Sequence, residues 1–487
     1  MKRQLLGGVG WLLAGQGLQQ FMQLAAFLLL ARFLAPDVFG HVAMASVIVD
    51  VAAMACQWGL GQIILQRRAV TPRLLTNVFF ASIAIALAFS LVILLGVLQY
   101  SLVYGFGLVP QLILSLIPIL LFQAIGAVPH ALLSKRMEFK WLAIRNNIAA
   151  LAGGGAAVLL ALAGMGVYAL VAQKLIAVFT LSLVLWIVAG KTIRLSLSSV
   201  DSRLLAGVLK AGAQLVSMPV VSIMAPRAMD ALIGVYLGAA VLGQFKIVWR
   251  IYQLIHDFTL NPVRTVLSSA LPRLTRRTEE FKSLYLQVVG SSGLLIVPLL
   301  AGIALTAKQW VPLVLGEQWL ETIPMFGVIA FIGPAMVIYS LQTPLLLSLR
   351  RSDLIVRQSV WNVISVSIIT FVGVHWGVNV VLMLYVASVY ALVALNWYSL
   401  SAGCGWSIHK DDLKAIFPFV ASSVAMGFFV SWLGSHLNYE SHLANLAVLA
   451  CGGMASYAIV LGIAFRPAFK GVLQGLDRAE SKVETAA

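Results

Sequence analysis

The sequence predicts an all-α protein that crosses a membrane many times. Of its 487 residues 61% are hydrophobic and only 10% are charged, and the mean hydropathy is +0.97. Ordinary soluble domains carry about 25% charged residues, so this composition excludes a soluble fold. The apolar residues also fall into about fourteen segments of about 20 residues, the length that a helix needs to cross a ~30 Å hydrocarbon core.

The predicted membrane spans follow one another with short connections. The longest polar connection in the first half is a stretch at 190–211, which we expect to be an amphipathic cytoplasmic linker. The expected spans lie near residues 9–31, 38–60, 77–98, 106–133, 146–164, 167–189, 212–233, 240–260, 284–306, 325–349, 358–374, 378–400, 415–434 and 443–465.

The basic residues indicate which side of the membrane each connection faces. Most of the 33 Lys and Arg residues lie in alternate gaps between the spans, whereas the other gaps contain only Arg32 and Lys308. Basic residues close to spans stay on the cytoplasmic side. We therefore expect a protein of the bacterial inner membrane with both termini in the cytoplasm. The net charge of +16 follows from the same rule, so it implies no nucleic-acid partner.

The chain contains an internal repeat. The segment FLAPDVFGH at 33–41 matches YLGAAVLGQ at 236–244, an offset of 203 residues (from 33 to 236). PHALLSKRMEF at 129–139 likewise matches PLLLSLRRSDL at 344–354. Each pair occupies the same place in two successive groups of six spans, so spans 1–6 and 7–12 are expected to be two copies of one unit.

This repeat predicts how the chain is organised. Six is an even number, so both copies enter the membrane from the same side and form parallel repeats, an arrangement known for alternating-access transporters. We expect two pseudo-symmetric six-helix lobes, at 1–195 and 196–405, and an appended hairpin of two spans with a cytoplasmic tail at 406–487.

Polar side chains inside the spans mark the predicted site, because charge within a membrane is costly and usually functional. They form stripes on spans 1, 2, 7 and 8, which correspond in pairs under the repeat. Lipid would exclude such stripes, so we expect them to face a central hydrated cavity. The predicted substrate-binding residues are Gln20, Asp50, Arg227, Asp230, Lys246, Arg250 and Gln253.

The surplus of cations in this set favours an anionic ligand. At the core of the expected cavity, Arg227, Lys246 and Arg250 stand against Asp230 alone, since Asp50 and Asp257 are expected nearer the helix ends. An Arg fork beside an ammonium suits a phosphate or diphosphate. The alternative is that the charges pair only with each other, Arg227 with Asp230 and Arg250 with Asp257, and hold helices together. Lys174 in span 6 is interpreted as a side chain that extends toward the membrane interface.

Other features of the sequence narrow the function. Two prolines in span 7, Pro219 and Pro226, predict a broken helix beside Arg227. His256 and His375 are interpreted as interface residues. The three cysteines are far apart and no ATP-binding motif is present, so we expect no cofactor, no metal and no catalytic residues.

Several longer stretches resemble one known family. They are ARFLAPDVFGHVAMASVI (31–48), GLGQIILQRR (59–68), VPHALLSKRMEFKWLAIRN (128–146), RAMDALIGVYLGAAVLGQFKIVWRI (227–251), NPVRTVLSSALPRL (261–274) and VPLVLGEQWLETIPMFGVIA (311–330). Together they resemble the polysaccharide transporters, the Wzx-like lipid-linked oligosaccharide flippases of the MOP superfamily. Asp230 stands at the acidic position of that family, whereas Gln244 and Phe245 replace its usual Tyr.

The resemblance implies a fourteen-helix, two-lobed, V-shaped fold. It also implies transport of an undecaprenyl-diphosphate-linked oligosaccharide to the periplasmic leaflet, for exopolysaccharide or O-antigen (lipopolysaccharide) biosynthesis. The implied partners are this lipid-linked substrate, membrane lipid, a polysaccharide polymerase, a chain-length regulator, and a proton or sodium ion as coupling ion.

Three alternatives remain open at this point. A drug/cation antiporter of the same superfamily would favour twelve spans and an acidic cavity. A lipid II flippase would share the span number and differ only in its motifs. A membrane glycosyltransferase or polymerase would need a sizeable outside loop carrying acids or Arg, whereas the outside loops here are short and almost uncharged. We therefore expect a transporter and not an enzyme.

Overall fold

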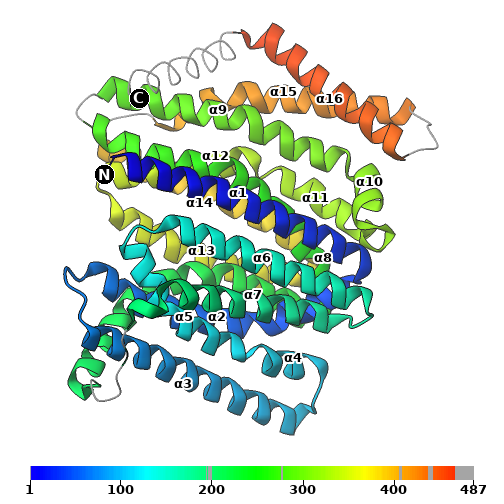
Figure 1. Ribbon diagram of the computed structural model, residues 1–487. Coiled ribbons are helices and arrows are strands. Elements are labelled where there is room, and N and C mark those ends of the chain that lie inside the picture. The colour runs from blue at the N-terminus through cyan, green and yellow to red at the C-terminus, as the bar shows by residue number, and fades with distance from the viewer. Residues whose placement is uncertain are drawn as a thin grey trace. The chain divides into compact units, whose positions relative to one another are not determined.

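The computed structural model describes residues 2–193, 195, 200–275, 278–404, 408–436 and 442–466 (Figure 1). Within these ranges the chain is almost entirely helical and contains no strand, so the predicted all-α class is confirmed. Residues 194 and 196–199 of the expected linker and the expected tail at 467–487 lie outside the described part of the chain.

The described residues include eleven helices that are long and apolar enough to cross a membrane, or up to twelve if one bent pair is a single span. That pair, Glu317–Ala330 and Gly333–Ser348, is bent by 58°. One of the eleven, Ile223–Leu274, has 52 residues. At 1.5 Å per residue it would be about 78 Å long, more than twice the ~30 Å hydrocarbon core, so it is long enough for two spans. The count of fourteen stays a prediction.

The chain divides into two compact units, Met1–Lys246 and Ile247–Ala487. The expected domain boundaries near 195 and 405 stay predictions. The helices of the first unit are α1 (Lys2–Phe33), α2 (Pro36–Gln66), α3 (Pro72–Tyr104), α4 (Leu108–Leu116), α5 (Pro118–Lys135), α6 (Phe139–Leu162), α7 (Val167–Ala189), the short η1 (Gly190–Thr192) and the first part of α8 (Ser202–Leu274).

The second unit contains the rest of α8 and the helices that follow it. They are α9 (Thr278–Leu305), α10 (Ala307–Trp310), η3 (Val311–Leu315), η4 (Glu317–Thr322), α11 (Ile323–Ala330), α12 (Gly333–Ser348), α13 (Ser352–Gly373), η5 (Val374–Trp376), α14 (Val378–Cys404), α15 (Ile408–His436) and α16 (His442–Ala464).

Local sequence signals define the ends of α2 and α3. Pro36 is the first residue of α2, where a missing N–H removes no helical hydrogen bond. Thr71 caps α3 by accepting a hydrogen bond from the Leu74 N–H at 3.3 Å. At the other end of α2, Lys135 from α5 donates to the Ile64 carbonyl at 2.9 Å and to the Arg67 carbonyl, which satisfies carbonyls that the helix leaves unpaired.

Small residues let the helices of the first unit pack closely. Figure 1 shows α6 beside α1 and α7, and these are among its main helix contacts. A Cβ at Gly154 would lie 2.9 Å from the Ala26 Cβ on α1, and one at Gly153 would lie 2.7 Å from the Gln173 carbonyl oxygen on α7. Association inside a membrane depends on such close packing, since lipid is as apolar as the side chains.

A close backbone contact joins the two copies of the repeat. A Cβ at Gly40 on α2 would lie 1.7 Å from the Ala239 carbonyl oxygen, and one at Gly243 would lie 1.7 Å from the Pro36 carbonyl oxygen. Positions 36 and 40 correspond to 239 and 243 under the repeat, so the two contacts are reciprocal. The sequence match at 33–41 and 236–244 is therefore also a match in structure.

The same symmetry accounts for a bend within α8. Gly238 has φ 88° and ψ 170°, so the helix breaks there and starts again at Ala239. Its counterpart is Ala35, the extended residue between α1 and α2 (φ −72°, ψ 159°). A positive φ is readily accessible only to glycine, so Gly238 alone can bend the chain between the two helical parts of α8.

The appended hairpin is attached to the rest of the second unit by polar contacts. The fully buried Asp412 of α15 accepts hydrogen bonds from Trp397 Nε1 of α14 at 2.8 Å and from the Tyr285 hydroxyl of α9 at 3.4 Å. Next to it, Lys282 of α9 pairs with Asp411 at 2.8 Å. In Figure 1, α15 runs alongside α9 and α16 runs beside α15, in agreement with the main helix contacts of this hairpin.

Candidate functional site

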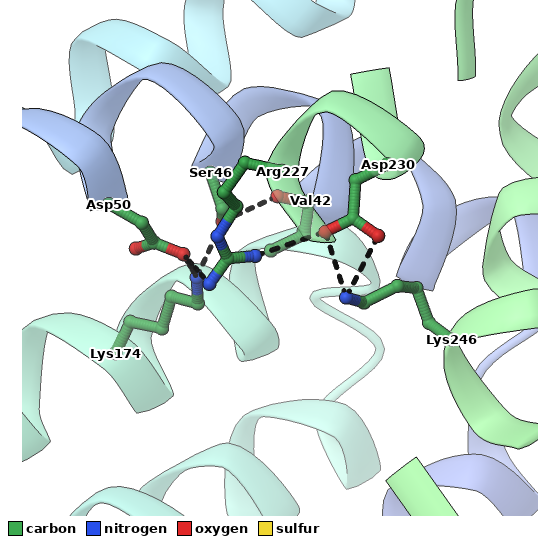
Figure 2. Close-up of polar contacts among 7 residues, drawn as sticks. All are labelled: Val42, Ser46, Asp50, Lys174, Arg227, Asp230 and Lys246. Atoms are coloured by element: carbon green, nitrogen blue, oxygen red, sulfur yellow. Dashed lines mark hydrogen bonds and ion pairs between the residues drawn. The ribbon is translucent and has the colours of Figure 1, made fainter. Parts of the chain in front are cut away.

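Five charged side chains from three helices form one network inside the first unit (Figure 2). Asp50 comes from α2, Lys174 from α7, and Arg227, Asp230 and Lys246 from α8. Four of the five belong to the predicted substrate-binding set. Asp50 is fourteen residues from the start of α2, or about 21 Å along the helix, which is near the middle of a span.

Arg227 lies between the two carboxylates. Its Nη2 is 2.9 Å from Asp50 Oδ2 on α2, and its Nη1 is 3.1 Å from Asp230 Oδ2 one turn further along α8. The third donor, Nε, is buried and has no hydrogen-bond partner among the described residues. A buried donor without a partner is unfavourable, so an acceptor placed beside Nε would be stabilising.

Lys246 shares the carboxylate of Asp230. Its ammonium lies 2.9 Å from Asp230 Oδ2 and 3.1 Å from Oδ1. The two residues are 16 positions apart, on opposite sides of the bend at Gly238. In a straight helix this separation would place them about 24 Å apart, so the glycine bend is what brings them together.

Lys174 is a member of the network that the sequence interpretation missed. Its ammonium is 3.4 Å from Asp50 Oδ2 and 2.6 Å from the Ser46 hydroxyl, which in turn donates to the Val42 carbonyl at 2.6 Å. The expectation that Lys174 extends toward the interface is therefore wrong. The available signal was the spacing of Ser46 and Asp50, which places two acceptors on one face of α2.

The arrangement suits the binding of an anion. Three cationic side chains face two carboxylates, which leaves a surplus of one positive charge. The side chains of the cations are 24–35% exposed, whereas that of Asp230 is only 2% exposed. A ligand can thus reach the three cations, whereas Asp230, the acid that pairs with Arg227 and Lys246, is buried. A phosphate could bind a guanidinium in bidentate fashion and an ammonium beside it.

The other predicted site residues lie outside this network. Gln20 is half-buried on α1 and makes no hydrogen bond to the five residues. Arg250 and Gln253 follow Lys246 on α8 but belong to the second unit. The expected break of the helix at Pro219 and Pro226 is wrong, because α8 stays helical through both prolines and departs from helical geometry at Gly238 instead.

A second polar feature lies wholly within the second unit. A cavity of about 210 Å³ is lined by residues of α8, α12, α13 and α14, among them Tyr252, Arg264 and Tyr339. His256 also lines it, with Nε2 3.1 Å from the Ser340 hydroxyl and Nδ1 3.3 Å from Asp257 Oδ1. His256 is thus part of a polar cavity wall, a role that a lone histidine in the sequence does not reveal.

The family model described as "Polysaccharide biosynthesis protein" matches residues 29–324, more than half of the chain. The chain belongs to this family. The succinoglycan biosynthesis transport protein ExoT of Rhizobium meliloti (strain 1021) is 22% identical over 488 residues, which cover 98% of this chain and 96% of that protein. The lipopolysaccharide biosynthesis protein WzxC of Escherichia coli (strain K12) is 23% identical over 354 residues, 68% of each chain.

Solved structures agree with this family at the level of the fold. The lipid II flippase MurJ in an inward closed conformation superposes with a TM-score of 0.76 at 13% identity, covering 94% of this chain and 99% of that one. An inward-facing multidrug resistance MATE transporter of the MOP superfamily gives 0.59 at 14% identity, covering 78% and 93%. The chain therefore has the same fold as these two transporters, and the protein is a multi-pass membrane protein.

Proposed function

We propose that the protein is a flippase for undecaprenyl-diphosphate-linked oligosaccharide repeat units. It moves them from the cytoplasmic to the periplasmic leaflet of the bacterial inner membrane, for exopolysaccharide or O-antigen biosynthesis. Membership of the polysaccharide biosynthesis family supports this proposal, as do two relatives named for polysaccharide transport and lipopolysaccharide biosynthesis. The observation that carries it is the network of three cations and two carboxylates, in which Arg227 Nε has no hydrogen-bond partner among the described residues.

The diphosphate is the part of such a substrate that most needs help in crossing. Burying an anion without partners is strongly unfavourable, and fixed cations can replace its lost hydration. Within the network, Asp50 and Asp230 hold the Arg227 guanidinium. An arriving diphosphate would compete with Asp50 for Arg227 and accept from its Nε, while Asp230 keeps Arg227 and Lys246 in position. Alternating access of the two lobes would then carry the bound headgroup across.

The remaining parts of the proposal concern orientation and partners. Both termini and the linker at 190–211 are cytoplasmic, as the basic residues predict. Transport is driven by a proton or sodium gradient, or by the supply and removal of the substrate itself, since the sequence has no nucleotide-binding motif. A polymerase and a chain-length regulator act on the exported unit. The protein is a transporter and performs no covalent chemistry on the substrate.

Substitutions at Arg227 test the proposed diphosphate site. In cells that lack the native copy, at matched protein level, Arg227→Ala should lower surface polysaccharide at least tenfold. Arg227→Lys should lower it less, because an ammonium keeps the charge but not the bidentate geometry. The matched control is Arg68→Ala, an exposed arginine outside the network. Normal export by Arg227→Ala would overturn the site. Rescue of cells without their lipid II flippase, or drug efflux, would favour the other transporter classes.

Cysteine labelling tests the orientation. Ser199→Cys, in the expected cytoplasmic linker, should be protected from a membrane-impermeant reagent in intact cells, whereas Gln318→Cys in the expected outside loop should be labelled. The background is a variant without Cys56, Cys404 and Cys451. Labelling of both positions from outside would contradict the proposed topology.

A further inference from the structure

An apolar cavity of about 590 Å³ lies within the first unit, among α2, α3, α4 and the part of α8 before its bend. Its wall consists of aliphatic side chains, Met44, Pro110 and Gly96, and the only polar group among its lining side chains is the hydroxyl of Tyr100. The volume is within the ~300–1,000 Å³ range of small-molecule sites. A cavity with almost no polar partners holds water poorly and hydrocarbon well.

The cavity continues from the charged network along two of the same helices. On α8, Ala231 and Val235 line the cavity and follow Arg227 at intervals of four residues, so all three lie on one face. On α2, the lining residue Val47 precedes Asp50 by three residues, again on one face. The cavity therefore begins within about one helical turn of the cations and extends toward the Pro36 end of α2.

A second apolar cavity, of about 720 Å³, lies in the second unit. Its lining comes from α12, α14, α15 and Phe465 and includes one cation, the exposed Lys414, but none of these elements contributes a residue to the charged network. The first-unit cavity is thus the one that shares helix faces with the five-residue network and its surplus of positive charge. This combination matches one kind of ligand, an amphiphile whose hydrocarbon chain is joined directly to an anionic head.

We propose that the first-unit cavity binds the head-proximal isoprene units of a polyprenyl diphosphate whose phosphates occupy the charged network. This inference rests on the proposed function and adds to it a site for the lipid part of the substrate. The branched, unsaturated chain would fill a cavity walled by branched aliphatic residues, and the diphosphate would lie beside Arg227. The diphosphate and the isoprene units would then be recognised by two adjoining sites of one unit, independently of the sugars.

Gly96 makes this proposal testable. It lines the cavity, and a Cβ built on it would meet no atom within 4 Å, so a larger side chain can enter the space without a backbone clash. Gly96→Leu should therefore fill part of the cavity while α3 stays helical. Gly155→Leu on α6 is the matched control, because Gly155 is also exposed with open space around it but lines none of the three cavities described above.

The experiment uses the full chain in lipid vesicles and a probe without sugars. The probe is a polyprenyl diphosphate with a photoactivatable group in its first few isoprene units, compared with phosphatidylglycerol carrying the same group in an acyl chain. Crosslinked peptides are identified by mass spectrometry. We expect the polyprenyl probe to label lining residues of α3 or α4. Labelling should fall at least fivefold in Gly96→Leu and in Arg227→Ala, and stay unchanged in Gly155→Leu.

Two results would overturn the inference. One is equal labelling by phosphatidylglycerol that an excess of polyprenyl diphosphate does not displace, because the cavity would then hold ordinary membrane lipid. The other is polyprenyl labelling confined to the cavity of the second unit. Failure of the proposed function is distinguishable: loss of the gene would leave surface polysaccharide unchanged, whereas the labelling of the purified protein by the sugar-free probe does not depend on export.

Discussion

The two copies of the repeat share a backbone arrangement but differ in chemistry. Ala35 and Gly238 each precede a helix start, and the helices that follow touch reciprocally through Gly40 and Gly243. The charged residues do not repeat in this way. The counterparts of Arg227, Asp230 and Lys246 are Leu24, Phe27 and Ala43, and that of Asp50 is Gln253.

The repeated backbone therefore forms the frame, and the charged residues that do not repeat form the candidate site. Asp50 and Lys174 come from the first copy, and the other three charged residues come from the second, so the ion pair of Arg227 with Asp50 joins the two copies. A duplicated backbone provides a symmetric frame, and divergence within it provides an asymmetric cluster. An asymmetric cluster suits a ligand with a distinct head and tail better than a symmetric one would. Four substitutions test this comparison, from the largest expected effect to the smallest.

Substitution at the close contact between the two copies should have the largest effect. In Gly40→Val the new Cβ would lie 1.7 Å from the Ala239 carbonyl oxygen, and a backbone atom cannot rotate out of the way as a side chain can. We expect export to fall more than tenfold, with less folded protein in size-exclusion profiles. Gly17→Val is the control, because a Cβ there meets nothing within 4 Å. Equal behaviour of the two variants would mean that the close contact is not needed.

Removal of the buried acid should come second. Asp230→Ala leaves Lys246 and one end of Arg227 without their carboxylate, so we expect a loss of about 3 kcal/mol in unfolding free energy, the lower end for broken buried pairs because the cations are partly exposed. Thermal unfolding of the purified protein measures it. Asp353→Ala removes an exposed acid of a surface pair and should change stability by less than about 0.5 kcal/mol. Similar stability of both variants would show that Asp230 does not order the cations.

Lys174 should affect transport more than stability. Among the described residues its ammonium contacts Asp50 and Ser46 and not the buried Asp230. Lys174→Met keeps most of the side-chain length and removes one positive charge, so export should fall several-fold with a stability change below about 1 kcal/mol. Lys191→Met, at an exposed position in η1, serves as the control. Unchanged export would limit the ligand site to Arg227 and Lys246.

The smallest effect is expected where the second copy is made more like the first. Gln253→Asp introduces the carboxylate that Asp50 supplies at the equivalent position, three residues after Arg250. Gln253 is exposed, so its replacement should hardly change stability, and the added negative charge should lower export about twofold. An export loss as large as that of Arg227→Ala would place a main substrate contact in the second copy.

Sequence alone could predict the features that depend on composition and local spacing. The apolar segments gave the fold class, the match at 33–41 and 236–244 gave the repeat, and charges within spans gave four of the five network residues. Each of these is a property of one segment or of two aligned segments. The proposed role of the network as a ligand site is a separate step, which rests on its geometry and charge.

The remaining features depend on which helices meet and were not predictable in this way. Lys174 is 124 residues from Asp50, and nothing in its own span indicates that α7 packs beside α2. The prolines of α8 suggested a break, yet the bend is at Gly238, because membrane helices can retain a proline when neighbouring groups satisfy the backbone. The cavity next to Gly96 is formed by four helices, so no single stretch of sequence reveals it.

The reciprocal contact of Gly40 and Gly243 has a consequence for how mutations combine. Each glycine faces a carbonyl oxygen at the start of the opposite helix, so a methyl group on either one would push apart the same two helix ends. Once the first substitution has separated them, the second meets more space. Gly40→Ala with Gly243→Ala should therefore destabilise the protein by clearly less than the two single effects added together. The two equivalent glycines therefore act as one site with respect to mutation, although they are 203 residues apart in the sequence (from 40 to 243).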